Sequence, residues 1–170
     1  FAHLQGVLNI SGELTDYFRR MGGPTHLYPF ASPKIAQNWT GTFDRRAFDV
    51  FASYYVQGVR RIYDEIRAYR KGPLALFYPS TVLLGEKAAG FEEYVKAKAV
   101  GEGLCRRLAG ADPNLHVGIK RLPRLATDQT RGLLGNEDPD SLVVMSGALT
   151  EFSSETAYLF AGQDGGMSWM

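Results

Sequence analysis

The feature that most constrains the fold is an alternation of short apolar segments with long amphipathic ones. The apolar segments cover residues 6–12, 74–79 and 116–122, and helices are predicted at 43–70 and 91–108. Each apolar segment is short, continuous and closed by Ser, Gly or Pro, which is typical of a buried strand in a parallel sheet. Strands that alternate with helices over short connections form layered α/β folds. The sequence therefore predicts an α/β protein in which helices flank a parallel sheet.

The segment between the first strand and the first helix has a different composition. Residues 13–42 contain the stretch "MGGPTHLYPFASPK", which is dense in Gly and Pro. These residues oppose regular structure, so the segment is predicted to be a lid-like loop with at most a helical turn near its start. Further along, Pro139 is well placed to begin a helix. A chain of 170 residues without internal repeats is expected to form a single domain over 1–170.

Charge and composition argue against several classes of function. The net charge of +1 and the lack of a long basic cluster indicate no nucleic-acid partner. One cysteine, Cys105, and three histidines leave no internal disulfide and no expected metal site. No apolar run reaches the roughly 18–20 residues that span a bilayer, so we expect a soluble, cytoplasmic protein without a membrane partner. The chain opens at Phe1 within a strand-like segment, which suggests a piece of a longer polypeptide.

A tyrosine and a lysine in the second predicted helix form a candidate catalytic pair. Tyr94 and Lys98 are four residues apart, and helical residues at this spacing lie on one face. An ammonium beside a phenol favours the phenolate and lowers the pKa of the tyrosine. Such a tyrosine can exchange a proton with a carbonyl or alcohol oxygen near neutral pH. The alternative is an ordinary tyrosine and lysine on a solvated helix face.

Polar or small residues at the ends of the three predicted strands could complete such a site. Ser80 follows the strand 74–79, where its hydroxyl could share a substrate oxygen with the tyrosine. Asn9 and Gly12 lie at the end of the first strand, and Pro123 and Thr127 follow the third. In open α/β sheets, ligands bind at the carboxyl ends of the strands. The strand ends and the helix are therefore predicted to converge on one site, although a turn or capping role for Ser80 remains the alternative.

Four segments together resemble the C-terminal, catalytic half of a short-chain dehydrogenase/reductase, in particular a ketoreductase. "YVKAK" resembles the Tyr-x-x-x-Lys motif of this family, and "FYPSTV" resembles the segment with its serine. "VLNISG" and "KRLPRLATDQT" are similar to the segments that border the cofactor in the family. The resemblance covers roughly residues 5–130 and implies a partial Rossmann-like sheet.

The resemblance also implies a role for each candidate residue. Tyr94 would be the general acid of carbonyl reduction, Lys98 would lower its pKa and hold the nicotinamide ribose, and Ser80 would orient the substrate oxygen. Asn9, Gly12, Pro123 and Thr127 would border an NADP or NAD cofactor, which supplies the hydride.

Several features of the family pattern are absent from the sequence. The glycine-rich turn that cradles the cofactor phosphates does not occur, so the N-terminal phosphate-binding half is predicted to be missing. The asparagine that the family carries in its long helix would fall near Tyr55. Arg124 stands where a glycine usually follows the proline.

The resulting interpretation is an NAD(P)H-dependent carbonyl reductase element of polyketide or fatty acid biosynthesis. The resemblance implies a β-ketoacyl thioester as substrate, presented by a carrier protein. Two alternatives remain: a non-catalytic, reductase-like domain of a larger synthase, and an extended-type sugar-nucleotide epimerase or dehydratase. The expected protein partners are an upstream segment or second chain that supplies the missing half, and a second copy in a homodimer.

Overall fold

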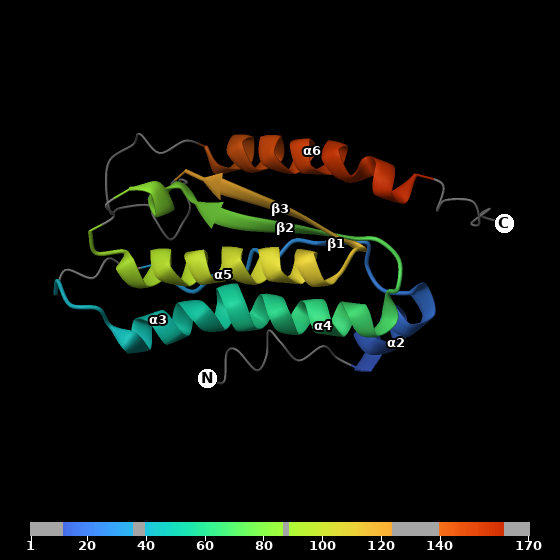
Figure 1. Ribbon diagram of the computed structural model, residues 1–170, viewed down its shortest axis with the longest axis horizontal. Helices are drawn as coiled ribbons and strands as arrows, with labels where there is room; N and C mark the ends of the chain where they lie inside the picture. The colour runs from blue at the N-terminus through green and yellow to red at the C-terminus, as the bar shows by residue number, and fades with distance from the viewer. Residues whose placement is uncertain (1–11, 36–39, 87–88, 124–139, 162–170) are drawn as a thin grey trace. The chain divides into compact units, whose positions relative to one another are not determined.

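The computed structural model describes residues 12–35, 40–86, 89–123 and 140–161. The chain divides into two compact units, Phe1–Arg124 and Leu125–Met170. Among the described residues, the first unit contains the strands β1, β2 and β3 and the helices α2 to α5 (Figure 1). In the described part of the second unit, α6 (Ser141–Phe160) begins after Asp140, whose side chain accepts a hydrogen bond from the Leu142 N–H at 2.8 Å. The single domain over 1–170 stays a prediction.

Three parallel strands form the sheet in the order β1-β2-β3. They are β1 (His26–Leu27), β2 (Leu74–Thr81) and β3 (Leu115–Leu122). Every residue of β2 is buried, as expected for the central strand of a sheet covered on both faces. The predicted strands 74–79 and 116–122 are therefore confirmed, as is the predicted α/β class with helices flanking a parallel sheet.

The third strand of the sheet comes from a segment for which no strand was predicted. β1 pairs with β2 through His26 opposite Ala75 and Leu27 opposite Leu76, and it lies inside the predicted loop 13–42. The same loop also contains a ten-residue helix, α2 (Gly12–Met21), which is followed by Gly22 and Gly23 at positive φ. The prediction of a mostly irregular segment is thus wrong for these two elements. Of the predicted strand 6–12, residues 6–11 lie outside the described residues and Gly12 begins α2 rather than ending a strand.

A long helical stretch leads from the end of the loop to β2. It consists of α3 (Arg45–Ala52), a π-helical segment η1 (Ser53–Gly58) and α4 (Val59–Tyr69), which confirms the helix predicted at 43–70. Asp44 begins it by accepting hydrogen bonds from two backbone N–H groups of the first turn. Its buried side chains recur every three or four residues: Phe51, Tyr55, Val59, Tyr63 and Ile66.

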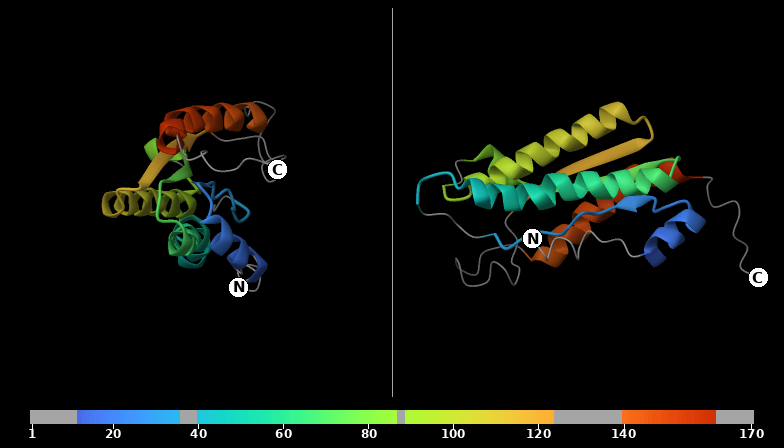
Figure 2. Two further views of the ribbon diagram at one scale, coloured as in Figure 1. Left: turned by 90° about the vertical axis from the view of Figure 1, so that its right-hand side faces the viewer. Right: turned by 90° about the horizontal axis from the view of Figure 1, so that it is seen from below.

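The second long helix, α5 (Glu92–Ala111), packs between the sheet and the α3–η1–α4 stretch, and it confirms the helix predicted at 91–108. Figures 1 and 2 show α5 running alongside α3 and α4. Gly101 allows this close approach: a Cβ atom there would lie 1.9 Å from the Tyr78 hydroxyl and 2.8 Å from the backbone oxygen of Tyr55. The Tyr78 hydroxyl occupies this space and donates a hydrogen bond to that oxygen at 3.3 Å. Gly101 therefore sets how closely α5, η1 and β2 meet.

None of the helices in the described ranges is long and apolar enough to cross a membrane.

Candidate active site

The carboxyl end of β2 brings two hydroxyl side chains to the start of α5. β2 ends with Ser80 and Thr81, and a short 3-10 helix, η2 (Val82–Gly85), follows. The Leu83 N–H donates a hydrogen bond to Thr81 Oγ1 at 3.3 Å, which fixes the Thr81 side chain at the strand end. Because strand residues alternate between the two faces of the sheet, Ser80 and Thr81 point in different directions.

Tyr94 pairs with Thr81. Burial raises the pKa of Tyr94 above its ordinary value, and a hydrogen bond with the Thr81 side chain acts in the opposite direction. Two aromatic rings hold the Tyr94 ring edge to face: Phe51 at 5.7 Å and Tyr55 at 5.8 Å between centroids. The result is an oriented tyrosine that is protonated near neutral pH, with a second hydroxyl beside it.

Lys98 is buried one turn further along α5. Its Nζ atom donates a hydrogen bond to the Pro79 carbonyl oxygen at 2.6 Å and lies 3.8 Å from the centroid of the Tyr55 ring. Burial lowers the pKa of Lys98 to about 7. The same Nζ atom lies 5.9 Å from the Tyr94 ring centroid. The spacing correctly predicted that the two residues share a helix face, but the pKa of Tyr94 moves opposite to the predicted direction because burial dominates.

Tyr55 lies near the place where the family pattern has its asparagine, and it contributes to this cluster through both its ring and its hydroxyl. It is buried in η1, and its hydroxyl lies 2.5 Å from the Ser32 Oγ atom. Ser32 lies between β1 and the first long helical stretch, in the segment that was predicted to be a lid. Burial raises the pKa of Tyr55, so its hydroxyl stays protonated.

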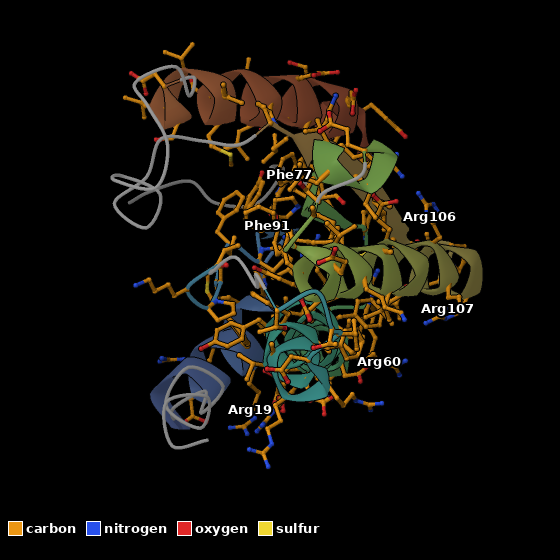
Figure 3. All side chains as sticks on the ribbon, turned by 90° about the vertical axis from the view of Figure 1, so that its left-hand side faces the viewer. Arg19, Arg60, Phe77, Phe91, Arg106 and Arg107 are labelled. Atoms are coloured by element: carbon orange, nitrogen blue, oxygen red, sulfur yellow. The ribbon has the colours of Figure 1, made fainter. Side chains whose placement is uncertain are left out.

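Ser80 is directed into a different network. Its hydroxyl donates a hydrogen bond to Glu102 Oε1 at 2.7 Å. Arg121 binds both oxygens of the Glu102 carboxylate, at 3.0 and 3.1 Å, and Arg106 binds Oε2 at 2.7 Å. Figure 3 shows Arg106 extending from the side of α5 that lies away from α3 and α4. These contacts, led by the hydrogen bonds from Arg121, lower the pKa of Glu102 to about 2.

The sequence prediction brought together the segments that carry Tyr94, Lys98 and Ser80, but it did not include every side chain of this cluster. Tyr94 and Lys98 lie on one face of α5 as predicted, whereas the Ser80 hydroxyl bonds to Glu102 and the side chain that acts on the Tyr94 pKa is Thr81. Strand alternation does not separate the two, because Ser80 shares its face of β2 with Tyr78, which packs against α5, the helix that carries Tyr94. The hydroxyls of Ser32 and Tyr55 carried no comparable sequence signal.

The other predicted site residues lie at the ends of helices or strands, or outside the described residues. Pro123 directly follows β3, as predicted. Gly12 begins α2. Asn9 and Thr127 lie outside the described residues, so their predicted contacts with a cofactor stay predictions.

Comparison with known proteins identifies the class of fold. No protein family and no curated protein matches the sequence. Among solved structures, a short chain dehydrogenase from Salmonella enterica serovar Typhi superposes with a TM-score of 0.70 at 12% identity, over 85% of this chain and 63% of that one. A ketone-specific alcohol dehydrogenase from Comamonas testosteroni gives a TM-score of 0.65 at 16% identity, over 84% of this chain and 57% of that one.

A third solved structure, the alternative dihydrofolate reductase FolM of Brucella canis in complex with NADP, gives a TM-score of 0.62 at 16% identity. The match covers 88% of this chain and 61% of the FolM chain. The fold is thus that of the short-chain dehydrogenases, in the form of a partial Rossmann-like sheet. The chain covers less than two thirds of each of these structures.

Proposed function

We propose that this chain carries the proton-transfer part of an NAD(P)H-dependent carbonyl reductase, with Tyr94 as the general acid. The observation that carries this proposal is the position of Lys98 Nζ, which lies 2.6 Å from the Pro79 carbonyl oxygen near the carboxyl end of β2 and 5.9 Å from the Tyr94 ring centroid. Ligands of open α/β sheets bind at this end of the strands. A short-chain dehydrogenase fold supports the same class of reaction.

In this proposal, a substrate carbonyl oxygen replaces Tyr94 as the acceptor of the Thr81 hydrogen and accepts a second hydrogen bond from the Tyr94 hydroxyl. Tyr94 is protonated at neutral pH because burial raises its pKa, so it can donate its proton as negative charge develops on that oxygen. Thr81 provides a second donor that stabilises the same charge. A nicotinamide cofactor would supply the hydride.

Among the described residues, Lys98 would contact one end of such a cofactor. In its protonated form the amine has three donor hydrogens, of which one is used by the Pro79 carbonyl, and the others would hold ribose hydroxyls beside Tyr94. The sequence contains no glycine-rich turn for the pyrophosphate. We therefore assign to this chain the ribose contact and the proton transfer, and assign phosphate binding to a further segment or a partner chain.

The substrate class rests on the ketoreductase resemblance, which favours a β-ketoacyl thioester carried by an acyl carrier. The test is an assay of the complete natural polypeptide with NADPH and a β-ketoacyl thioester, compared with its Tyr94→Phe variant. We expect Tyr94→Phe to lower kcat about 10²–10⁴-fold, because it removes the proton donor and keeps the ring. Tyr158→Phe, at an exposed tyrosine of α6, is the matched control and should change nothing.

Unchanged activity of Tyr94→Phe would contradict the proposal. The epimerase alternative predicts a different result. The complete polypeptide would then interconvert a sugar nucleotide without net consumption of NADPH, and Tyr94 would be the proton-transfer residue of that reaction.

One observation favours a second candidate, a non-catalytic reductase-like domain. The Lys98 amine is enclosed by the Tyr55 ring and the Pro79 carbonyl, with 6% of the residue exposed, and it can be satisfied without a ligand. Calorimetry of the complete polypeptide with NADPH and NADH separates the two candidates. Lack of binding by the complete polypeptide would support the non-catalytic domain.

A further inference from the structure

The surroundings of Lys98 show what holds its amine in place. Three kinds of group face it: the rings of Tyr55 on η1 and Tyr78 on β2, the Pro79 carbonyl, and side chains of its own helix. The nearest ring is that of Tyr55, at 3.8 Å from Nζ to centroid, compared with 5.4 Å for Tyr78. From α5, the groups on this side are Tyr94 and the thiol of Cys105, and Glu102 follows one turn after Lys98.

None of these groups forms an ion pair with Lys98. The Glu102 carboxylate is bound by Arg121, Arg106 and Ser80. Burial raises the pKa of the Cys105 thiol to about 12, so the thiol is neutral near pH 7. The protonated amine is therefore stabilised by uncharged partners alone. Among these, the electron-rich face of an aromatic ring at this distance binds an ammonium group strongly when water is excluded.

The Tyr55 ring is itself fixed by a hydrogen bond at its far end. Ser32 Oγ donates its single hydrogen to the Pro33 carbonyl at 3.0 Å. It therefore accepts at 2.5 Å from the Tyr55 hydroxyl, which acts as the donor. The Tyr55 backbone is held as well, because its carbonyl accepts from the Tyr78 hydroxyl.

We infer that Tyr55 is the positioning residue for Lys98, because its ring binds the ammonium group, while its hydroxyl makes a separate bond to Ser32. This inference deepens the proposed function, because it assigns to an aromatic side chain the task of orienting the lysine beside Tyr94. It also links the segment after β1 to the candidate site, through Ser32.

The test measures the ionisation of Lys98 directly and needs no activity. The protein has six lysines, so ¹³C,¹⁵N-lysine labelling gives few side-chain signals, and the signal that Lys98→Met removes belongs to Lys98. The pKa of Lys98 is then read from the pH dependence of its Cε and Nζ shifts in the wild type, Tyr55→Leu and Tyr55→Phe.

We expect Tyr55→Leu to lower the pKa of Lys98 by about 0.4–1.5 units. This range is the free energy of a cation–π contact expressed as a difference in pKa. Tyr55→Phe keeps the ring and should leave the pKa within about 0.3 units of the wild-type value, because a phenyl ring binds cations nearly as well. An unchanged or higher pKa in Tyr55→Leu would overturn the inference, as would a large shift in Tyr55→Phe.

If Tyr55→Leu does not fold, ring-fluorinated phenylalanine at position 55 provides the same test with the ring volume retained. Fluorine withdraws electron density from the ring face, so the pKa of Lys98 should fall stepwise with the number of fluorines. A pKa independent of fluorination would equally overturn the inference. The result is separate from the proposed function: Tyr94→Phe tests catalysis, and the Lys98 titration tests positioning even in a protein without activity.

Discussion

The Ser80 hydroxyl lies 2.7 Å from Glu102 Oε1, while the side chain of the next residue, Thr81, acts to lower the pKa of Tyr94. Two adjacent hydroxyl residues at one strand end therefore serve different networks. Ser80 helps to bind a buried carboxylate, and Thr81 faces the candidate acid. This division predicts opposite consequences for their substitution.

Thr81→Ala is expected to reduce the kcat of the complete enzyme by about 10²-fold, the usual effect of losing one donor to a developing oxyanion. Thr81→Ser retains the hydroxyl and should preserve most of the activity. Ser80→Ala is expected to lower the free energy of unfolding and leave kcat near the wild-type value. Steady-state kinetics and urea unfolding of the three variants check this; a larger loss of kcat in Ser80→Ala than in Thr81→Ala would reverse the assignment.

The Glu102 carboxylate should make stability depend on pH in the acid range. Its pKa is lowered to about 2 in the fold, below the ordinary value of 4.5, so its contribution is complete above pH 4.5 and lost as the pH falls towards 2. Between pH 6 and 3 this amounts to about 2 kcal/mol of unfolding free energy. Glu102→Gln should flatten this part of the stability curve. A variant whose acid dependence equals that of the wild type would show that Glu102 is not the responsible group.

Lys98 should produce a pH dependence in the opposite range. Its pKa is about 7 in the fold and 10.5 ordinarily, so between these values the unfolded chain holds a proton that the folded protein has released. Stability should therefore rise with pH, by about 2 kcal/mol between pH 7 and 9. Chemical denaturation of the wild type and Lys98→Met across this interval measures the effect, which the variant should lack. Equal slopes in the two proteins would contradict the lowered pKa.

Gly101 and Gly110 lie on the same helix, α5, but substitution by alanine is expected to change the stability of the protein in opposite directions at the two positions. Gly101→Ala places a methyl group against the Tyr78 hydroxyl and the Tyr55 backbone oxygen, and should destabilise the protein by about 3 kcal/mol. At Gly110 no atom lies within 4 Å of an added Cβ, so Gly110→Ala should stabilise it by about 0.5–1 kcal/mol. Thermal unfolding of both variants provides the comparison. A neutral Gly101→Ala would mean that α5 can move away from β2 at little cost.

The parts of the fold with a strong periodic signal could be predicted from the sequence. β2, β3 and both long helices fall where apolar runs and three-to-four-residue spacing indicated them. β1 could not be found in this way, because it has two residues and a proline lies close to it on either side. Its place in the sheet depends on pairing with β2, a long-range contact that local composition does not report.

The candidate site shows the same division between local and tertiary information. Helical spacing alone places Tyr94 and Lys98 on one face. The pKa values of these two residues depend on burial by β2 and η1, which are distant in sequence, so the predicted lowering of the Tyr94 pKa was opposite to the one found. The choice between Ser80 and Thr81 could not be made from strand alternation, because Ser80 shares its face of β2 with Tyr78, which packs against the helix that carries Tyr94.

The π-helical segment Ser53–Gly58 sets the rotational phase between α3 and α4. An α-helix turns by about 100° for each residue, so removing one residue here to give a regular α-helix would rotate α3 by about that angle relative to α4. Val59 and Ile66 would stay in the core, whereas Phe51 would turn away from the Tyr94 ring that it now contacts at 5.7 Å. A one-residue deletion in this segment would thus turn the α3 side chains that now surround Tyr94 away from it, with little change in the length of the helix.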